Sequence, residues 1–125
     1  PAPRRPRMIT ELALGPLTVR GVSVGGVYTT LHVPQLDLML DAGLAPRSFA
    51  GARTLFLTHG HVDHAGALGT LLGIRALQGQ RAPLRVVLPA EIVDAVKHSL
   101  EATAALQHWP LTIDAVSMRA GEEAP

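Results

Sequence analysis

Three histidines and one aspartate fall within six consecutive positions near the middle of the chain. They are His59, His61, Asp63 and His64, with Gly60 between the first two. Neutral imidazole and carboxylate are suitable ligands for zinc and related divalent metals. His59 and His61 point the same way in an extended segment, whereas Asp63 and His64 fall where the chain turns into the next element. One such loop can serve two metal ions; the alternative is a surface turn that is rich in histidine by chance.

The elements that must position this cluster follow from the hydropathy pattern. Residues 54–58 form a short run rich in apolar side chains, which is typical of a strand covered on both faces. The run ends directly before His59. Leucines at helical spacing follow over residues 65–77, with glycines that permit close packing against a sheet. The cluster is therefore expected in the loop between a buried strand and a helix.

The rest of the chain predicts strands first and then alternating strands and helices. Runs of β-forming residues separated by Gly and Pro indicate an antiparallel meander before the cluster. The expected strands are residues 9–14, 17–24, 27–33, 36–40, 54–58, 84–88 and 111–118, and the expected helices are residues 65–77 and 89–107. This order predicts an α+β fold with a mixed, mostly antiparallel sheet and helices on one face.

Length and composition limit the classes of protein that fit. The chain has 125 residues, of which 47% are hydrophobic, so we expect one domain over residues 8–125 after a flexible Pro- and Arg-rich arm at residues 1–7. The arm is either a solvated tail or a contact to RNA phosphates. The absence of cysteine excludes thiolate zinc sites, a thiol nucleophile and a disulfide scaffold. No apolar run is long enough for a membrane span or a signal peptide, so we expect a cytoplasmic protein without membrane contact.

Charge and aromatic content argue against a general nucleic-acid binder. Lys plus Arg minus Asp plus Glu is 11 − 10 = +1. The chain has two Phe, one Trp and one Tyr, too few for a platform on which successive bases stack. Any contact with RNA must therefore depend on charge and shape.

The pattern His59-x-His61-x-Asp63-His64 resembles the signature of the metallo-β-lactamase-fold hydrolases. Together with the Asp-Ala-Gly sequence at residues 41–43 and the segment at residues 87–92, it looks most like the short-form ribonuclease Z group of tRNA 3′-end-processing endonucleases. The likeness covers about residues 17–123. It implies that the chain is the N-terminal half of an αββα metallo-β-lactamase-type sandwich.

The resemblance also implies roles for particular residues. His59 and His61 would bind one zinc ion, and Asp63 and His64 a second. Asp63 would in addition be the catalytic proton acceptor in the hydrolysis of a phosphodiester of a tRNA precursor. Asp41 and Thr58 would support the ligands. For Asp41, an ordinary turn-capping role before a glycine is the alternative.

The family completes its metal site with ligands from later loops. Only His98 and His108 follow the cluster in this chain, and we expect both to be ordinary surface or core-edge residues and His32 to be structural. The chain should therefore work with a C-terminal half, in the same or a separate chain, or with a second copy, and a homodimer is expected. The alternatives are another hydrolase of this fold, acting on a lactam, lactone, thioester or sulfate ester, and a non-catalytic metal-binding or self-associating half-domain.

Overall fold

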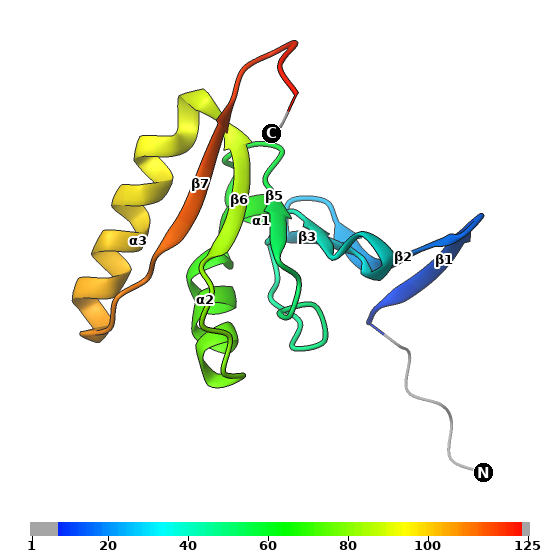
Figure 1. The fold of residues 1–125 in the computed structure, drawn as a ribbon, viewed down its shortest axis with the longest axis horizontal. Helices are drawn as coiled ribbons and strands as arrows, with labels where there is room; N and C mark the ends of the chain where they lie inside the picture. The colour runs from blue at the N-terminus through cyan, green and yellow to red at the C-terminus, as the bar shows by residue number, and fades with distance from the viewer. Residues whose placement is uncertain (1–7, 124–125) are drawn as a thin grey trace.

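The centre of the molecule is one seven-stranded sheet whose strands lie in chain order (Figure 1). The structure is a computed structural model that describes residues 8–123, and the arm predicted at residues 1–7 lies outside this range. The strands are β1 (Thr10–Leu14), β2 (Leu17–Val24), β3 (Tyr28–Val33), β4 (Leu38–Leu40), β5 (Thr54–Phe56), β6 (Leu84–Pro89) and β7 (Ile113–Met118).

The sheet has an antiparallel and a parallel part. Strands β1 to β4 form the predicted antiparallel meander. Strands β4 to β7 pair in parallel, because each connection between them crosses back over the sheet. The predicted α+β class with a mixed sheet is confirmed, and its pairings divide equally between the two kinds.

The helices follow two of the parallel strands, β5 and β6, and cover one face of the parallel part of the sheet. They are α1 (Val62–Ala65), α2 (Leu68–Leu77) and α3 (Val93–Gln107). Successive right-handed crossovers place α2 and α3 on the same side, and a methyl group on Gly69 of α2 would lie 3.6 Å from the side chain of Thr103 of α3. Figure 1 shows α1 and α2 behind β5 and β6, with α3 alongside β7. Within residues 8–123, no helix has the length and apolar character needed to cross a membrane.

Several predicted boundaries were wrong for local backbone reasons. The helix expected at residues 65–77 is divided, since the chain turns at Gly66, where a side chain would meet the carbonyl oxygen of Val62. The strand expected at 36–40 is shortened by a 3-10 turn, η1 (Pro34–Leu36), and by a left-handed residue, Asp37, at φ 52°.

Two further boundaries lie close to the histidine cluster. The helix expected at 89–107 begins later, because Pro89 belongs to β6 and a second 3-10 turn, η2 (Ala90–Ile92), precedes α3. The strand expected at 54–58 ends at Phe56. Thr58 does not continue the strand, because its N–H donates to the carboxylate of Asp41 rather than to the backbone of a neighbouring strand.

The core lies between the sheet and the helices. Met39, Leu55 and Val86 share this face by register and are buried. The opposite face carries an apolar row, in register across four strands: Leu40, Phe56, Val87 and Val116. Strand β5 was expected to be covered on both faces. In the part of the chain that the structure describes, helices cover only one of its faces. The apolar row is what a second layer would cover.

Candidate metal centre

The loop after β5 and the short helix α1 that follows it bring the four predicted ligands together. The ring centroids of His59 and His61 are 4.7 Å apart in an edge-on arrangement. Those of His59 and His64 are 4.2 Å apart. Oδ2 of Asp63 lies 3.4 Å from Nε2 of His64. The three imidazoles and the carboxylate therefore form one cluster at the carboxyl end of β5.

Asp41, at the end of β4, is fixed by its backbone beside this cluster. Its N–H donates to the carbonyl of Phe56 at 2.8 Å, and its carbonyl accepts from the buried hydroxyl of Thr30 at 2.9 Å. The residue has a left-handed backbone at φ 59°, which Asp tolerates better than most residues. Its side chain is only 6% exposed. Such a buried carboxylate requires hydrogen-bond donors.

The donors to the Asp41 carboxylate come from the histidine loop. Oδ1 accepts the backbone N–H of Thr58 at 2.8 Å, and Oδ2 accepts the Thr58 hydroxyl at 2.8 Å. Oδ2 also lies 2.8 Å from Nδ1 of His64. The side chain thus bonds across the fold to the loop rather than within its own turn.

This network determines which nitrogen of two imidazoles is free. A carboxylate only accepts, so neutral His64 donates from Nδ1 and carries its lone pair on Nε2. The single hydroxyl proton of Thr58 goes to Asp41, and the Thr58 oxygen therefore accepts from Nδ1 of His59 at 2.8 Å. Nε2 of His59 also keeps its lone pair. Both neutral rings are held in the tautomer that metal ligation through Nε2 requires.

Backbone contacts hold the same segments together. The Ala42 N–H donates to the carbonyl of His64 at 2.6 Å, and the Ala67 N–H donates to the carbonyl of Ala42 at 2.7 Å. Gly43 packs directly on the peptide of Asp63, where an added Cβ would lie 1.7 Å from the carbonyl oxygen. A side chain at position 43 is therefore incompatible with this position of the loop.

One pair of donors, Asp63 and His64, has the spacing of two ligands of one divalent metal ion. Two ligand atoms about 2.1 Å from one tetrahedral ion lie about 3.4 Å apart, which is the separation of Asp63 Oδ2 from His64 Nε2. Across residues 8–123, no group of three or more His, Asp or Glu side chains is arranged to hold a metal ion by itself. A complete coordination shell would therefore need ligands in addition to these side chains.

The other histidines lie apart from the cluster. His98 is exposed on α3, and His108 is exposed directly after α3. His32 on β3 is 8% exposed, and its ring centroid lies 4.8 Å from that of Phe49. Burial lowers the pKa of His32 below 6.5, and the positive charge of Arg20 lowers this pKa further.

Sequence reasoning missed Thr30. Its hydroxyl supports the carbonyl of Asp41 from β3, but a buried Thr in a strand has no local pattern that distinguishes it. The close approach of Gly43 to Asp63 was missed for the same reason, because the two residues are distant in sequence.

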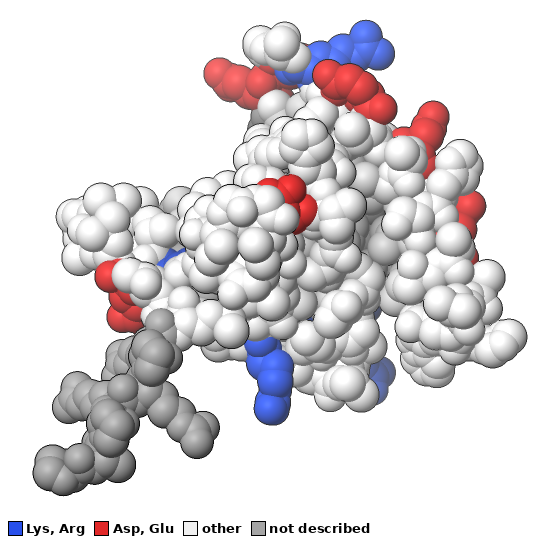
Figure 2. All heavy atoms as spheres, turned by 180° about the vertical axis from the view of Figure 1, so that it is seen from behind, with Lys and Arg blue, Asp and Glu red and all other residues white. Residues whose placement is uncertain are grey.

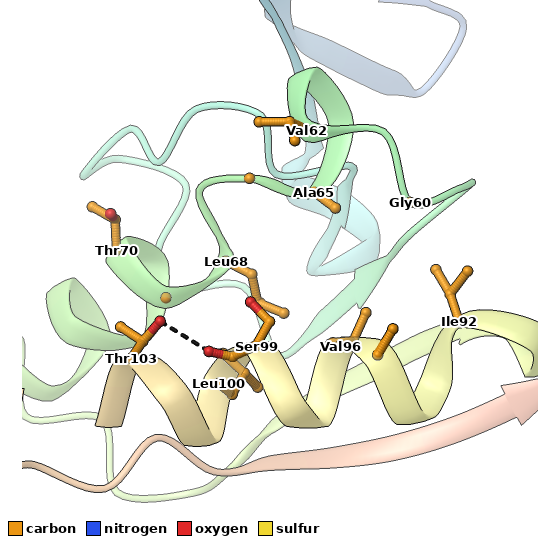
Figure 3. A pocket seen from close by; sticks show the side chains of 13 residues that line it. Gly60, Val62, Ala65, Leu68, Thr70, Ile92, Val96, Ser99, Leu100 and Thr103 are labelled. Carbon is orange, nitrogen blue, oxygen red and sulfur yellow. Dashed lines mark hydrogen bonds between the residues drawn. The ribbon is translucent and has the colours of Figure 1, made fainter. Parts of the chain in front are cut away.

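A groove of about 360 Å³ borders the loop but contains no titratable side chain. Figure 3 shows it between the segment that runs from Gly60 to Thr70 and the facing side of α3, which contributes Val96 and Ser99. The walls are apolar or small, and the histidine rings do not line it. The groove therefore offers no acid, base or metal ligand, and the titratable side chains of the loop lie outside it.

The mixed sheet, with helices on one face, is half of a metallo-β-lactamase-type sandwich. Over most of its length the chain is homologous to proteins named ribonuclease Z, as the sequence pattern indicated. It is 31% identical over 104 residues to a chloroplastic tRNase Z of Arabidopsis thaliana, a match that covers 83% of this chain and 29% of the relative.

Two further relatives come from another plant and from a bacterium. The chain is 30% identical over 105 residues to a nuclear ribonuclease Z of Triticum aestivum, covering 84% of this chain and 59% of the relative. It is 32% identical over 109 residues to a ribonuclease Z of Enterococcus faecalis, covering 87% and 33%. The chain therefore spans about a third to three fifths of these relatives. No protein-family model matches the chain.

Proposed function

We propose that this chain supplies the N-terminal half of a zinc-dependent phosphodiester hydrolase that cleaves tRNA precursors at their 3′ ends. The observation that carries the proposal is the cluster of three imidazoles and one carboxylate at the end of β5, which hydrogen bonds from Asp41 hold in place. The names of the similar proteins, which include tRNase Z and ribonuclease Z, support RNA as the substrate.

The proposed centre would hold two zinc ions. His59 and His61 would hold one ion, and Asp63 and His64 the other. The chemistry that bound zinc supplies is activation of water near neutral pH and neutralisation of the charge on the phosphodiester. The remaining ligands would come from the C-terminal half.

The side chains of this chain orient the ligands and accept a proton. Asp41 orients the ring of His64, and Thr58 orients the ring of His59, so that Nε2 of each ring is free. The two rings therefore need not reorient when a metal ion binds. Asp63 is 19% exposed, and its Oδ2 faces the ligand atom of His64. We assign to the Asp63 carboxylate the acceptance of the proton from the attacking water. The water oxygen then forms the new bond to phosphorus as the bond from phosphorus to the leaving ribose oxygen breaks, and that oxygen leaves as a hydroxyl after it takes up a proton.

The apolar row on the open sheet face supports a second layer. Leu40, Phe56 and Val116 are only half-buried there, and an apolar face of this kind is normally covered. The similar proteins are longer than this chain, so we propose that the rest of a longer chain forms the layer. The alternatives are a separate C-terminal chain and a homodimer. Measuring the mass of the native protein would reveal either one. A cytoplasmic location belongs to the same proposal.

Cleavage of a 3′-extended tRNA precursor tests the proposed function. The complete protein, loaded with zinc, should release the 3′ trailer. His61→Ala should lower kcat/KM by about 100-fold or more, since a metal's charge stabilisation is worth several kcal/mol. His98→Ala, on exposed α3, is the matched control and should leave the rate unchanged.

Three results would contradict the proposal. Hydrolysis of a lactam, lactone, thioester or sulfate ester with the precursor left intact would overturn the substrate. No hydrolysis by the complete, zinc-loaded protein would favour the non-catalytic half-domain. Cleavage unaffected by His61→Ala would remove the loop from the reaction.

A further inference from the structure

We infer that Thr30 is a positioning residue of the metal centre, which acts on the ligand histidines through the backbone of Asp41. Thr30 lies within β3 and is fully buried, and its hydroxyl donates to the carbonyl of Asp41 rather than to any of the four proposed ligands. The inference rests on the proposed function, since those ligands are the ones assigned to zinc. It extends the site from the histidine loop into the antiparallel part of the sheet.

The first link is the backbone of Asp41. Its left-handed conformation, at φ 59°, is sparsely populated by residues other than glycine and persists only where the surrounding structure holds it. Two hydrogen bonds hold the residue: its N–H donates to the carbonyl of Phe56 at 2.8 Å, and its carbonyl accepts from Thr30 at 2.9 Å. Loss of the Thr30 hydroxyl would remove one of these two bonds and deprive a buried carbonyl of its donor.

The second link is the Asp41 carboxylate, whose direction depends on that backbone conformation. Its Oδ2 accepts the hydroxyl of Thr58 and lies 2.8 Å from Nδ1 of His64. The Thr58 oxygen in turn accepts from Nδ1 of His59. A change of φ or ψ at Asp41 would swing the carboxylate away from all of these partners together. His64 is therefore linked to Thr30 through Asp41 alone, and His59 through Asp41 and Thr58.

The hydroxyl of Thr30 approaches Asp41 from a fixed direction. A β-branched side chain has few rotamers, and this one is 0% exposed. Val22 on β2 is its cross-strand partner. Strand β2 also packs closely here, because a Cβ on Gly21 would lie 2.4 Å from the carbonyl oxygen of Thr30. A hydroxyl held in this way can select one backbone conformation of the residue that it contacts.

Hydrogen bonds rather than surface charges must orient the Asp41 side chain. The side chain is only 6% exposed, so it needs donors in direct contact. Figure 2 shows that the rear face of the molecule, where α1 and α2 lie, has few charged side chains over its middle and more toward its rim. Exposed charges at a distance are also screened by salt. The bond from Thr30 is therefore not duplicated by a surface field.

Two substitutions of Thr30 separate its hydroxyl from its shape. Thr30→Val removes the hydroxyl and keeps the shape, whereas Thr30→Ser keeps the hydroxyl and removes a methyl group from the core. Thr29→Val is the matched control on the same strand. The hydroxyl of Thr29 pairs with that of Ser23, and its bond to the N–H of Gly43 uses the backbone carbonyl, which the substitution preserves.

The first readout is NMR of the complete protein after a chelator has removed its metal. The proton on Nδ1 of His64, bonded to a buried carboxylate, should give a downfield signal that exchanges slowly with water. Thr30→Val should lose this signal and the fixed tautomer of His59, whereas Thr30→Ser and Thr29→Val should keep both. A residue that acted only by packing would give the opposite order, because the serine variant is the one that lacks a core methyl group.

The second readout is zinc affinity, measured by isothermal titration of the same proteins. Thr30→Val should weaken zinc binding about fivefold, as expected for the loss of one hydrogen bond on which the ligand geometry depends. Thr30→Ser and Thr29→Val should bind zinc as tightly as the unsubstituted protein. If Thr30→Val does not fold, Thr30→Cys replaces it, because a thiol is a weaker donor than a hydroxyl.

The outcomes separate this inference from the proposed function. An unchanged His64 signal in Thr30→Val, or in Thr30→Cys if that variant is used, would overturn the inference. Equal losses of the signal in Thr30→Ser and Thr30→Val would overturn it as well. Loss of the signal in Thr30→Val alone would uphold the link from Thr30 to His64, even if the unsubstituted protein bound no zinc and the proposed function failed.

Zinc binding that is equally tight in Thr30→Val and the unsubstituted protein would leave the proposed function standing and remove the positioning role.

Discussion

Nδ1 of His64 donates a 2.8 Å hydrogen bond to the carboxylate of Asp41, a residue 23 positions earlier in the chain. The same carboxylate holds Thr58, whose hydroxyl accepts from His59. One buried side chain thus orients two imidazoles of the cluster. Because the protons on both Nδ1 atoms face inward, both Nε2 atoms are available to a metal.

Asp41→Asn should weaken zinc binding by about 10- to 100-fold, which is the usual effect of removing a group that orients a metal-ligating histidine. Asn tolerates the left-handed backbone at this position, but its NH2 group would face a donor in place of a carboxylate oxygen. Isothermal titration of the complete protein measures the affinity. Asp114→Asn, at an exposed position on β7, is the control. Equal affinities in the two variants would contradict the role given to Asp41.

Thr58→Val removes the hydroxyl that links Asp41 to His59 but keeps the backbone N–H and the shape of the side chain. We expect zinc affinity to fall about tenfold, because the tautomer of His59 is no longer fixed. Thr58→Ser keeps the hydroxyl and should restore the affinity. Nitrogen chemical shifts of the imidazole report the tautomer directly. A His59 ring that keeps its proton on Nδ1 in Thr58→Val would show that the hydroxyl does not select it.

The sequence predicted the strands and the position of the loop because their signals are local. Alternation and β-forming residues are sufficient to identify β2, and the apolar run ending at His59 identifies β5. Backbone details were not predictable in this way. The left-handed conformation of Asp37 accompanies a hydrogen bond to the carbonyl of Pro34, and the turn at Gly66 brings its Cα close to the carbonyl of Val62. Hydropathy does not record such backbone contacts.

The candidate site divides along the same line. The ligand types and spacing of residues 59–64 are a local pattern and could be predicted. The role of Asp41 depends on partners 17 and 23 residues away. Its local sequence, Asp before Ala-Gly, is equally compatible with a turn cap, so residue spacing alone left that alternative open. The family resemblance, rather than any physical signal in the sequence, indicated the long-range role.

Gly43→Ala should destabilise the fold by at least about 1–3 kcal/mol, because its methyl group would overlap the peptide of Asp63 and the backbone must move. Urea unfolding measures the loss. Gly51→Ala is the control, since the nearest atom to a Cβ there is 3.8 Å away, on a flexible Gln80 side chain. If both variants unfold at the same urea concentration, position 43 is not the close approach described.

Stability should fall as the pH drops below about 6.5, and His32 should account for part of the loss. Burial, assisted by Arg20 and opposed by Asp37, lowers the pKa of His32 in the folded chain below its ordinary value of 6.5. As the pH falls, the unfolded chain therefore takes up this proton first, and unfolding is favoured. The stability contributed by neutral His32 is complete above pH 6.5 and is lost toward its lower folded pKa.

Urea unfolding at about pH 7.5 and about pH 5 measures this dependence. His32→Leu should lose less stability between the two values than the unsubstituted chain. His98→Leu, at an exposed position on α3, should lose as much as the unsubstituted chain. If His32→Leu and the unsubstituted chain lose equal stability, the buried imidazole is not the titrating group.

The zinc content of the complete protein tests the metal centre most directly. Elemental analysis after gel filtration should find two zinc ions for each copy of the histidine loop, and His61→Ala should reduce that content while His98→Ala should not. A protein that retains no zinc, or retains the same amount in His61→Ala as in His98→Ala, would show that the four side chains at the end of β5 do not bind metal.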